Sequence, residues 1–388
     1  MQHEDEEGKS STFSSTTLRW REIKGAENIP RTGRLCHTIT PIHGNRLFCW
    51  GGWGGEEERY TDAFIFDVEL EEWTPVECKG DVPAPRSTHS MTSINGGKQL
   101  LLFAGYLGGE RRTNDMHILD VDSLTWRLIQ PKNGVVPPAR NTHSATLLGD
   151  GRRIVVFGGR NSSHFFNDVW MFDIPTTTWT PLTMSGNDSI PSGRSGHSAV
   201  LKGDNRIIIF GGWDGGRNRF GQVWELDPLN QKWILHDPMA IDSHQPAARS
   251  GHTAALLNQQ EMVVFGGWGE GVYCSDVYIL HLERMEWRRV APAGIKCPSP
   301  RRFHAMASIP PFGAFIHGGK SHDYQQQYND MFVLSVGPPS LQGMCKQHIK
   351  DNLARYKSER EWPAIPLELR SSMEENNAEE EAEKEAQL

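Results

Sequence analysis

The sequence predicts an all-β protein, built mainly as a six-bladed β-propeller that an N-terminal strand closes and a short α-helical segment follows. Three observations lead to this prediction: a motif that occurs six times, a pair of small residues after each copy, and a tryptophan later in most copies. Short strands at even spacing with Gly- and Pro-rich turns are typical of propellers. The 39 glycines and 13 tryptophans among 388 residues agree with a chain of many tight turns.

The repeated motif is the tetrapeptide Arg-x-x-His. The distances between successive histidines are 52, 54, 54, 55 and 52 residues, and a fixed period of this length indicates a repeat architecture. The six copies run over residues 34–37, 86–89, 140–143, 194–197, 249–252 and 301–304.

A pair of small residues follows each motif and ends an apolar run such as RIVVF (153–157). Glycine at a crowded strand end leaves room where a Cβ would clash, or allows a positive φ. The pairs are Gly51-Gly52, Ala104-Gly105, Gly158-Gly159, Gly211-Gly212, Gly266-Gly267 and Gly318-Gly319.

Each copy then has an Asp, or Gln222 in the fourth copy, before a second apolar run, and a Trp eleven residues later in five of the copies. The pattern predicts four strands per copy: one after the motif, one ending at the small pair, one after the Asp, and one holding the Trp.

The sixth copy has Leu341 where the Trp is expected. Residues 17–23, TLRWREI, have the missing pattern, so we expect this N-terminal strand to complete the last blade and leave no open sheet edge.

A period near 50 with Gly-Gly and a later Trp resembles the kelch repeat, and the resemblance covers residues 18–336. It implies a kelch propeller. Residues that recur in every copy are expected to hold the blades together, since polar groups between blades need partners. The informative positions are those that differ between copies.

Two such sets lie near strand ends that should converge on one face of the propeller. The residue after each small pair and the two residues inside each motif give aromatic, cationic and hydroxyl side chains, a composition typical of binding hot spots. The candidate peptide-binding residues are Trp53, Tyr106, Arg160, Ser195, Trp213, Ser250, Trp268, Arg302 and Lys320. Loop arginines add positive charge nearby: Arg59, Arg111, Arg112, Arg217 and Arg219. In the alternative interpretation, the aromatic residues only cap strand ends and the arginines are solvated.

Charge and composition exclude several functions. The net charge is −8, of which residues 374–388 carry −6, so we expect no nucleic-acid partner. No apolar run is long enough for a membrane span, and the acidic N-terminus has no signal-peptide pattern. The six cysteines lack metal-ligand spacing and are expected to be free thiols, in the cytoplasm or alternatively the nucleus. Neither a catalytic motif nor a cofactor or metal site is recognisable, so we expect a protein without enzymatic activity.

The segment after the propeller predicts an amphipathic helix. Pro338-Pro339 ends the last strand, Ser340 is a suitable N-cap, and apolar residues then recur at spacings of three and four. The apolar stripe is Leu341, Met344, Cys345, Ile349 and Leu353. Taken alone, this pattern is that of a helix packed against the outside of the propeller.

Ser340-Leu341-x-x-x-Cys345-x-x-x-Ile349 resembles the BC box, the helix that docks on elongin C. Ile365-Pro366-Leu367-Glu368-Leu369 resembles the cullin box that follows it in the same family. Together with the kelch repeats, these motifs resemble the kelch-domain-containing substrate receptors of cullin-2 RING–elongin B/C ubiquitin ligases. The resemblance assigns Leu341, Met344, Cys345 and Ile349 to elongin binding, and Ile365, Pro366 and Leu369 to cullin binding.

Receptors of that family capture C-terminal degrons, so the resemblance implies a carboxylate clamp formed by Arg160 and Ser195. This sequence departs from the family pattern at Phe165, where a second arginine is expected. Two other functions stay open: a kelch interaction scaffold without a ubiquitin role, and a kelch lyase or oxidase with a bound metal.

The expected domain organisation has four parts. These are a disordered N-terminus (1–16), the propeller (17–336), the BC-box and cullin-box segment (337–370) and a disordered acidic tail (371–388).

Overall fold

The computed structural model describes residues 17–23, 33–54, 59–185, 190–241, 244–294, 296–322 and 326–336. The chain divides into two compact units, 1–336 and 337–388, and the second lies wholly outside the described residues. The predicted helix, BC box, cullin box and acidic tail therefore lie outside them too. Within the described part the protein is all-β, with one short 3-10 helix, η1 (Asn95–Gly97). No helix there is long and apolar enough to cross a membrane.

The described strands form six sheets of four or five strands and one small three-stranded sheet. Sheet 1 contains β2 (Thr38–Ile42), β3 (Arg46–Trp50), β4 (Ala63–Asp67) and β5 (Glu72–Val76). Sheet 2 contains β7 (Ser90–Ile94), β8 (Gln99–Gly108), β9 (Arg111–Asp120), β10 (Thr125–Ile129) and β6 (Lys79–Gly80). Sheet 3 contains β11 (Ser144–Leu147), β12 (Arg153–Phe157), β13 (Val169–Asp173) and β14 (Thr178–Leu182).

Sheet 4 contains β15 (Ser198–Lys202), β16 (Arg206–Phe210), β17 (Val223–Asp227) and β18 (Lys232–His236). Sheet 5 contains β21 (Thr253–Leu256), β22 (Glu261–Phe265), β25 (Val277–His281), β26 (Glu286–Val290) and β19 (Met239–Ala240). Sheet 6 contains β27 (Ala305–Ile309), β28 (Gly313–His317), β29 (Met331–Val336) and β1 (Leu18–Glu22). The small sheet contains β20 (Arg249–Ser250), β23 (Trp268–Gly269) and β24 (Val272–Tyr273).

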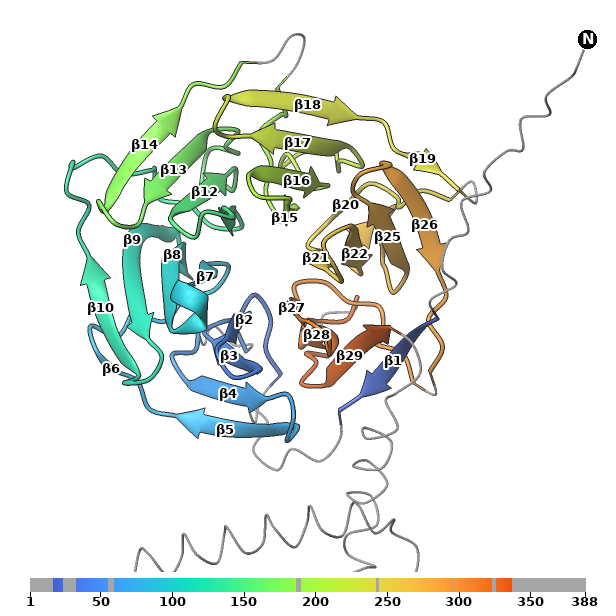
Figure 1. Ribbon diagram of the computed structural model, residues 1–388, viewed down its shortest axis with the longest axis horizontal. Helices are drawn as coiled ribbons and strands as arrows, with labels where there is room; N and C mark the ends of the chain where they lie inside the picture. Colours follow the sequence, from blue (N-terminus) through green and yellow to red (C-terminus); the bar gives the residue numbers. More distant parts are fainter. Residues whose placement is uncertain are drawn as a thin grey trace, which may run out of the picture. The chain divides into compact units, whose positions relative to one another are not determined.

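The predicted strand order within each copy is found, and two sheets differ from it by one strand. The short strands β6 and β19 pair in parallel with β10 and β26 at the outer edges of sheets 2 and 5. Figure 1 shows the six sheets around a common axis, each with its first strand innermost. The innermost strands β2, β7, β11, β15, β21 and β27 contact one another in that order, and β27 contacts β2.

The hydrophobic core lies between neighbouring sheets rather than within one of them. The second strand of each sheet is buried over most of its length because sheets cover both of its faces. The aromatic residue that ends this strand packs on the fourth-strand Trp of the next sheet, as Phe157 does on Trp233 with 4.9 Å between ring centroids. Every repeated Trp therefore contributes to an interface between sheets.

The N-terminal strand follows the same rule. β1 pairs antiparallel with β29, with Trp20 opposite Leu334. The Trp20 ring lies 5.3 Å from the ring of Phe265 in sheet 5, which is the packing that the other Trp residues make. Leu18 and Trp20 are both buried in the cluster between sheets 5 and 6.

The arginine of each motif is fully buried and structural, as expected. In five sheets its guanidinium forms a two-pronged ion pair with the repeated Asp, at 2.5–3.1 Å, and also donates to the carbonyl oxygen of the first residue in the small pair. The exception is Arg194, whose partner is the neutral Gln222 at 3.5 Å. Burial without a carboxylate lowers the pKa of Arg194 to about 10.

The motif histidine joins neighbouring sheets. In five interfaces its Nε2 hydrogen-bonds the hydroxyl of the Ser or Thr that follows the histidine of the preceding motif, at 2.6–3.2 Å. Burial lowers the pKa of these histidines, for example that of His89 to about 3, so they stay neutral near pH 7. The expectation that the repeated Arg and His hold the sheets together is confirmed for the histidine side chain. The arginine side chain bonds within its own sheet, and its carbonyl oxygen accepts from the second residue of the small pair in the preceding copy.

We expect Gln222→Asp to raise the free energy of unfolding at pH 7 by about 1–3 kcal/mol, because it gives buried Arg194 a carboxylate. Sheet 3 has the required geometry, since Asp168 there accepts bonds from both Arg140 and Trp170. Asp276→Asn, which removes a carboxylate from a complete pair, should lower it by about 3 kcal/mol. Urea unfolding monitored by tryptophan fluorescence would measure both changes. A Gln222→Asp variant that is no more stable than the wild type would contradict this account.

Trp20→Ala should destabilise the domain by about 3–5 kcal/mol, because it empties a buried site between two sheets. Arg19→Ala on the same strand is the control and should change stability by less than about 0.5 kcal/mol, because Arg19 is exposed. Deletion of residues 1–23 should act like Trp20→Ala, but more strongly. Thermal unfolding of the three variants decides the matter, and a deletion that melts like the intact chain would show that β1 adds nothing to the domain.

Candidate peptide-binding mouth

The centre of the domain is lined by a ring of backbone hydrogen bonds. The third residue of each motif donates its N–H to the carbonyl oxygen of the equivalent residue in the preceding motif, at 2.8–3.0 Å. The chain of donors is closed: Cys36 to Phe303, Phe303 to Gly251, Gly251 to Gly196, Gly196 to Thr142, Thr142 to Thr88, and Thr88 to Cys36. All six residues have φ between +54° and +66°, which four of them adopt without being glycine.

The candidate binding residues lie next to this ring in pairs. The second residue of each motif forms an antiparallel bridge with the residue after the small pair of the same copy. The bridges are Leu35–Trp53, Ser87–Tyr106, Asn141–Arg160, Ser195–Trp213, Ser250–Trp268 and Arg302–Lys320. All nine residues expected at the mouth are members of these six bridges. The two sets chosen from the sequence are therefore paired with each other around one end of the channel.

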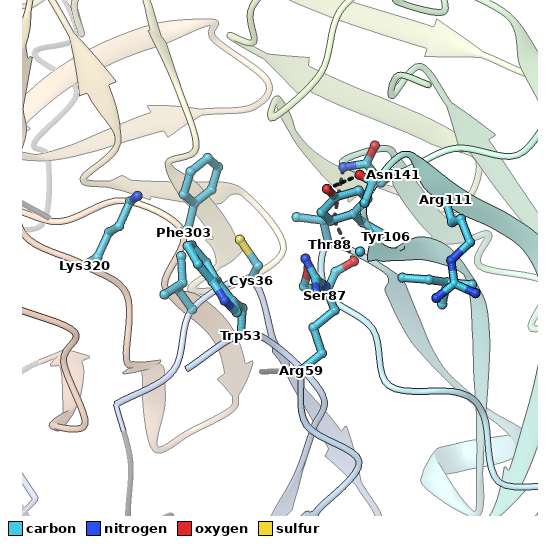
Figure 2. Close-up of a pocket in the computed structure, with 14 residues that line it drawn as sticks. Cys36, Trp53, Arg59, Ser87, Thr88, Tyr106, Arg111, Asn141, Phe303 and Lys320 are labelled. Atoms are coloured by element: carbon cyan, nitrogen blue, oxygen red, sulfur yellow. Dashed lines mark hydrogen bonds between the residues drawn. The ribbon is translucent and has the colours of Figure 1, made fainter. Parts of the chain in front are cut away.

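A pocket of about 880 Å³ opens beside the ring, over sheets 1, 2 and 6. Figure 2 shows Lys320 and Phe303 on one side of it and Tyr106, Asn141 and Arg111 on the other. The lining residues are Leu35, Cys36, Trp53, Arg59, Ser87, Thr88, Tyr106, Leu107, Gly108, Gly109, Arg111, Asn141, Phe303 and Lys320.

This pocket contains three of the nine expected residues, namely Trp53, Tyr106 and Lys320. The other six do not line it: Arg160, Ser195, Trp213, Ser250, Trp268 and Arg302. Arg160 and Ser195 belong to bridges of sheets 3 and 4, so the carboxylate clamp implied by the family resemblance lies beside this pocket and remains a prediction.

A hairpin makes the pocket asymmetric. β8 and β9 are each ten residues long and continue past the small pair through two register shifts, whereas the equivalent second strands end at the pair. The tip of this hairpin contributes Leu107, Gly108, Gly109 and Arg111 to the lining. The sequence gives only a weak indication of this long hairpin, namely Ala104 in place of the first glycine of the small pair. A strand that continues past the pair was not expected.

Cations and aromatic rings alternate around the mouth. Tyr106 lies between the guanidinium groups of Arg59 and Arg112, whose carbons are 4.6 and 5.0 Å from its ring centroid. Trp268 lies in the same way between Arg219 and Arg302, at 3.8 and 5.0 Å. Such stacking holds an arginine in place at little conformational cost.

The pocket is electropositive. Arg59, Arg111 and Lys320 line it, and none of its described lining residues is acidic. Burial, and then the positive charge of Arg302, lowers the pKa of Lys320 to about 8. Burial and the nearby Arg112 likewise lower the pKa of Arg160.

Polar groups complete the lining. Asn141 donates to the Thr88 hydroxyl at 3.1 Å and accepts from Arg112 at 3.0 Å, which fixes its side chain. Burial raises the pKa of the Cys36 thiol to about 12, so the thiol stays protonated. The pocket is therefore suited to holding an anionic, partly apolar ligand.

The sequence also matches a known family. The KLHDC2/KLHL20/DRC7 Kelch-repeats domain is found over residues 4–204 and 187–340. The chain belongs to this kelch-repeat family. Its fold is accordingly a kelch-repeat propeller, as the Arg-x-x-His and Gly-Gly pattern predicted.

Several known proteins resemble this kelch protein. Kelch domain-containing protein 3 of Bos taurus is 30% identical over 275 residues, which cover 66% of this chain and 68% of that protein. Acyl-CoA-binding domain-containing protein 4 of Arabidopsis thaliana is 29% identical over 258 residues, 64% of this chain and 37% of that protein. Host cell factor homolog hcf-1 of Caenorhabditis elegans is 26% identical over 287 residues, 68% of this chain and 35% of that protein. Kelch-repeat propellers of this family are typically non-enzymatic, and the fold supports a role in protein interaction.

Binding of an acidic peptide to the mouth should weaken by about fivefold between pH 7 and pH 9. An anionic peptide binds the charged form of Lys320 more tightly than the neutral form. The affinity is therefore highest at pH values below the Lys320 pKa of about 8, and it falls as the pH rises through that value. Lys320→Arg should keep the affinity and abolish the pH dependence, while Lys320→Met should bind weakly at both pH values. Fluorescence anisotropy with a labelled peptide would measure this, and an unchanged pH profile in Lys320→Arg would assign the effect to another group.

Proposed function

We propose that this kelch protein is the substrate-recognition subunit of a cullin-RING ubiquitin ligase assembled with elongin B/C. In this proposal the propeller mouth binds a peptide degron, a protein C-terminus, and the other subunits carry out ubiquitin transfer. The observation that carries the proposal is the electropositive pocket at the mouth, which is lined by Arg59, Arg111 and Lys320.

The size and chemistry of the pocket support a peptide ligand. A volume of about 880 Å³ is within the range of pockets that enclose small ligands, and it is large enough for the last few residues of a chain. A terminal carboxylate is an anion that arginine binds with two parallel hydrogen bonds. Trp53, Tyr106 and Phe303 offer apolar contact to the side chains that precede it. Arg160, Ser195, Ser250 and Arg302 would extend the contact area around the ring.

The adaptor role rests on the C-terminal motifs. Leu341, Met344, Cys345 and Ile349 would bind elongin C, and Ile365, Pro366 and Leu369 would bind the cullin, which we take to be cullin-2. These residues lie outside the described part of the chain, so the support for them is their order behind a kelch domain of the KLHDC2/KLHL20 type.

We also infer that the propeller has six blades, one for each of sheets 1–6, and that β1 closes it. This is supported by the pairing of β1 with β29, by the contact of β27 with β2, and by the closed ring of six backbone hydrogen bonds. Closure matters for function, because the pocket is formed by sheets from both ends of the domain, with Lys320 and Phe303 beside Trp53.

The second candidate function is a kelch interaction scaffold without a role in ubiquitin transfer. The chain also resembles proteins with unrelated names, including the flagellar outer arm dynein alpha chain of Chlamydomonas reinhardtii, with 30% identity over 290 residues. A propeller mouth alone therefore does not imply a ligase. This candidate predicts that residues 341–369 are dispensable for partner binding.

Co-purification with elongin B/C tests the adaptor role directly. We expect the intact chain to form a stoichiometric complex, and the double variant Leu341→Ala, Cys345→Ala to lose it, because both residues belong to the BC-box pattern. Gln347→Ala, on the polar side of the predicted helix, is the matched control and should bind normally. A well-folded intact chain that does not bind elongin B/C would exclude the ligase role and favour the scaffold.

The degron mode has a separate test. A pool of peptides with free C-termini is compared with the same peptides amidated at the C-terminus. We expect binding that requires the free carboxylate and that weakens by more than about tenfold in Arg59→Ala or Arg111→Ala, because each would remove charged hydrogen bonds within the pocket. Equal binding of both pools would exclude C-terminal recognition and leave the elongin result unaffected.

A further inference from the structure

The interface between sheets 6 and 1 departs from the other five. Position 305, after the sixth motif histidine, is Ala, whereas the other copies have Ser or Thr there. The residue before the small pair is His317 in sheet 6, where the other copies have Phe or Trp. In β3 the residue before the last is Cys49, where the others have Leu, Ile or Val. Three independent exceptions to the repeat thus occur in one interface.

The side chains of His317 and Cys49 lie close together in the structure, beside His37, the motif histidine that faces Ala305. Nδ1 of His317 forms a 2.9 Å hydrogen bond with Nε2 of His37. In this interface the His317 ring thus takes the place of the Ser or Thr hydroxyl that the other motif histidines bind. Cys49 lies beside them, and the ligand atoms of His37, Cys49 and His317 all lie within 4.8 Å of one another. All three residues are buried. A hydrogen bond between two histidines accounts for His317 and Ala305, but it does not account for the thiol.

We propose that His37, Cys49 and His317 form a binding site for one soft monovalent metal ion, Cu(I), between sheets 1 and 6. Two imidazole nitrogens and a thiolate are a ligand set that suits copper. The site does not depend on the proposed ligase function.

The geometry needs only a small adjustment. Bonds of about 2.0–2.3 Å to nitrogen and sulfur separate three donor atoms by roughly 3.5–4 Å. His37 and His317 would move apart from their hydrogen-bonded distance while Cys49 stays within reach.

Charge favours Cu(I) over a divalent ion. Arg34 is fully buried, and its positive charge acts on both Cys49 and His37. Cu(I), a thiolate and two neutral imidazoles sum to zero charge, whereas Zn(II) would leave one uncompensated positive charge beside a buried arginine. Zn(II) in structural sites also prefers four ligands, and this cluster supplies three.

The protonation states are consistent with this ion. Burial lowers the pKa of His317 to about 3 and that of His37 well below its usual range, so both rings are neutral near pH 7. Burial raises the pKa of Cys49 to about 11, so the thiol is protonated before binding. Binding forms an S–Cu(I) bond, breaks the S–H bond of Cys49 and releases that proton. The imidazole that donates the hydrogen bond between the two rings shifts its own proton to its other ring nitrogen, which leaves both facing nitrogens able to bind the ion. Because one proton is released, the affinity should rise with pH by about tenfold per unit as long as the thiol is protonated before binding.

A cavity on the axis of the domain reaches His37. His37 lines a narrow channel of about 130 Å³ together with the other five motif histidines. Cys36 lines both this channel and the pocket at the mouth. Thr88 and Phe303 are likewise shared by the two cavities, so we take the axis as the route by which the ion would reach His37.

The test is a Cu(I) competition titration of the intact chain under anaerobic conditions, with bathocuproine disulfonate as the coloured competing chelator. We expect one equivalent of Cu(I) to be withheld from the chelator, with an affinity that rises about tenfold from pH 6 to pH 7. Cys49→Val, which installs the residue type of the other copies, should lower the affinity more than a hundredfold. Cys297→Ser removes an exposed thiol and is the control that should retain the tight site.

A second variant guards against loss of fold. His317→Phe combined with Ala305→Ser installs the packing and hydroxyl of the other interfaces, so the apo domain should melt near the wild-type temperature. Cu(I) should raise the melting temperature of the wild type and leave that of both variants unchanged, because the ion binds only the folded site. Failure of the wild type to retain Cu(I), or equal retention by Cys49→Val, would overturn the proposal and leave the histidine pair as a structural hydrogen bond.

Discussion

The structure depends on the burial of one guanidinium group in every repeat. A fully buried arginine is costly unless a carboxylate and further acceptors surround it. In five copies the repeated Asp and the carbonyl oxygen of the small pair supply these together, and in the fourth copy Gln222 takes the place of the Asp. The arginine therefore fixes the end of the second strand relative to the start of the third. It also fixes the motif that carries it, and with that motif the residues that line the channel.

This arrangement separates the parts of the protein that must stay constant from the parts that are able to vary. In each motif the arginine and the histidine are held by the interior, and the backbone of the two residues between them is placed by the bridges and the central ring of hydrogen bonds. Their side chains are thus free to differ from copy to copy, as Leu35, Ser87 and Arg302 do, without altering the ring beneath them. The mouth of this kelch protein obtains its charge and its aromatic surface in this way.

Much of this could be predicted from the sequence, for a physical reason. Repetition shows which residues the fold needs, and a residue one position away from a repeated one has a known place. The nine mouth residues were found by this logic and lie in the six bridges. The pocket could not be placed in the same way, because its position depends on the long β8–β9 hairpin, whose register shifts leave little trace in composition. The cluster of Cys49 and His317 was also missed, because spacing within a motif cannot reveal ligands that lie at opposite ends of a domain.

The pairing of β1 with β29 has a consequence for how the chain is made. The strand with Leu18 and Trp20 leaves the ribosome first, and its partner follows more than 300 residues later. At roughly 5–20 residues per second, translation alone delays their meeting by about 15–60 s. Throughout that time the last interface of the domain is incomplete, and an apolar edge is open to other nascent chains. Leu18 and Trp20 thus stay without the partners that bury them until residue 336 has been synthesised, and this interface is the last of the domain to form.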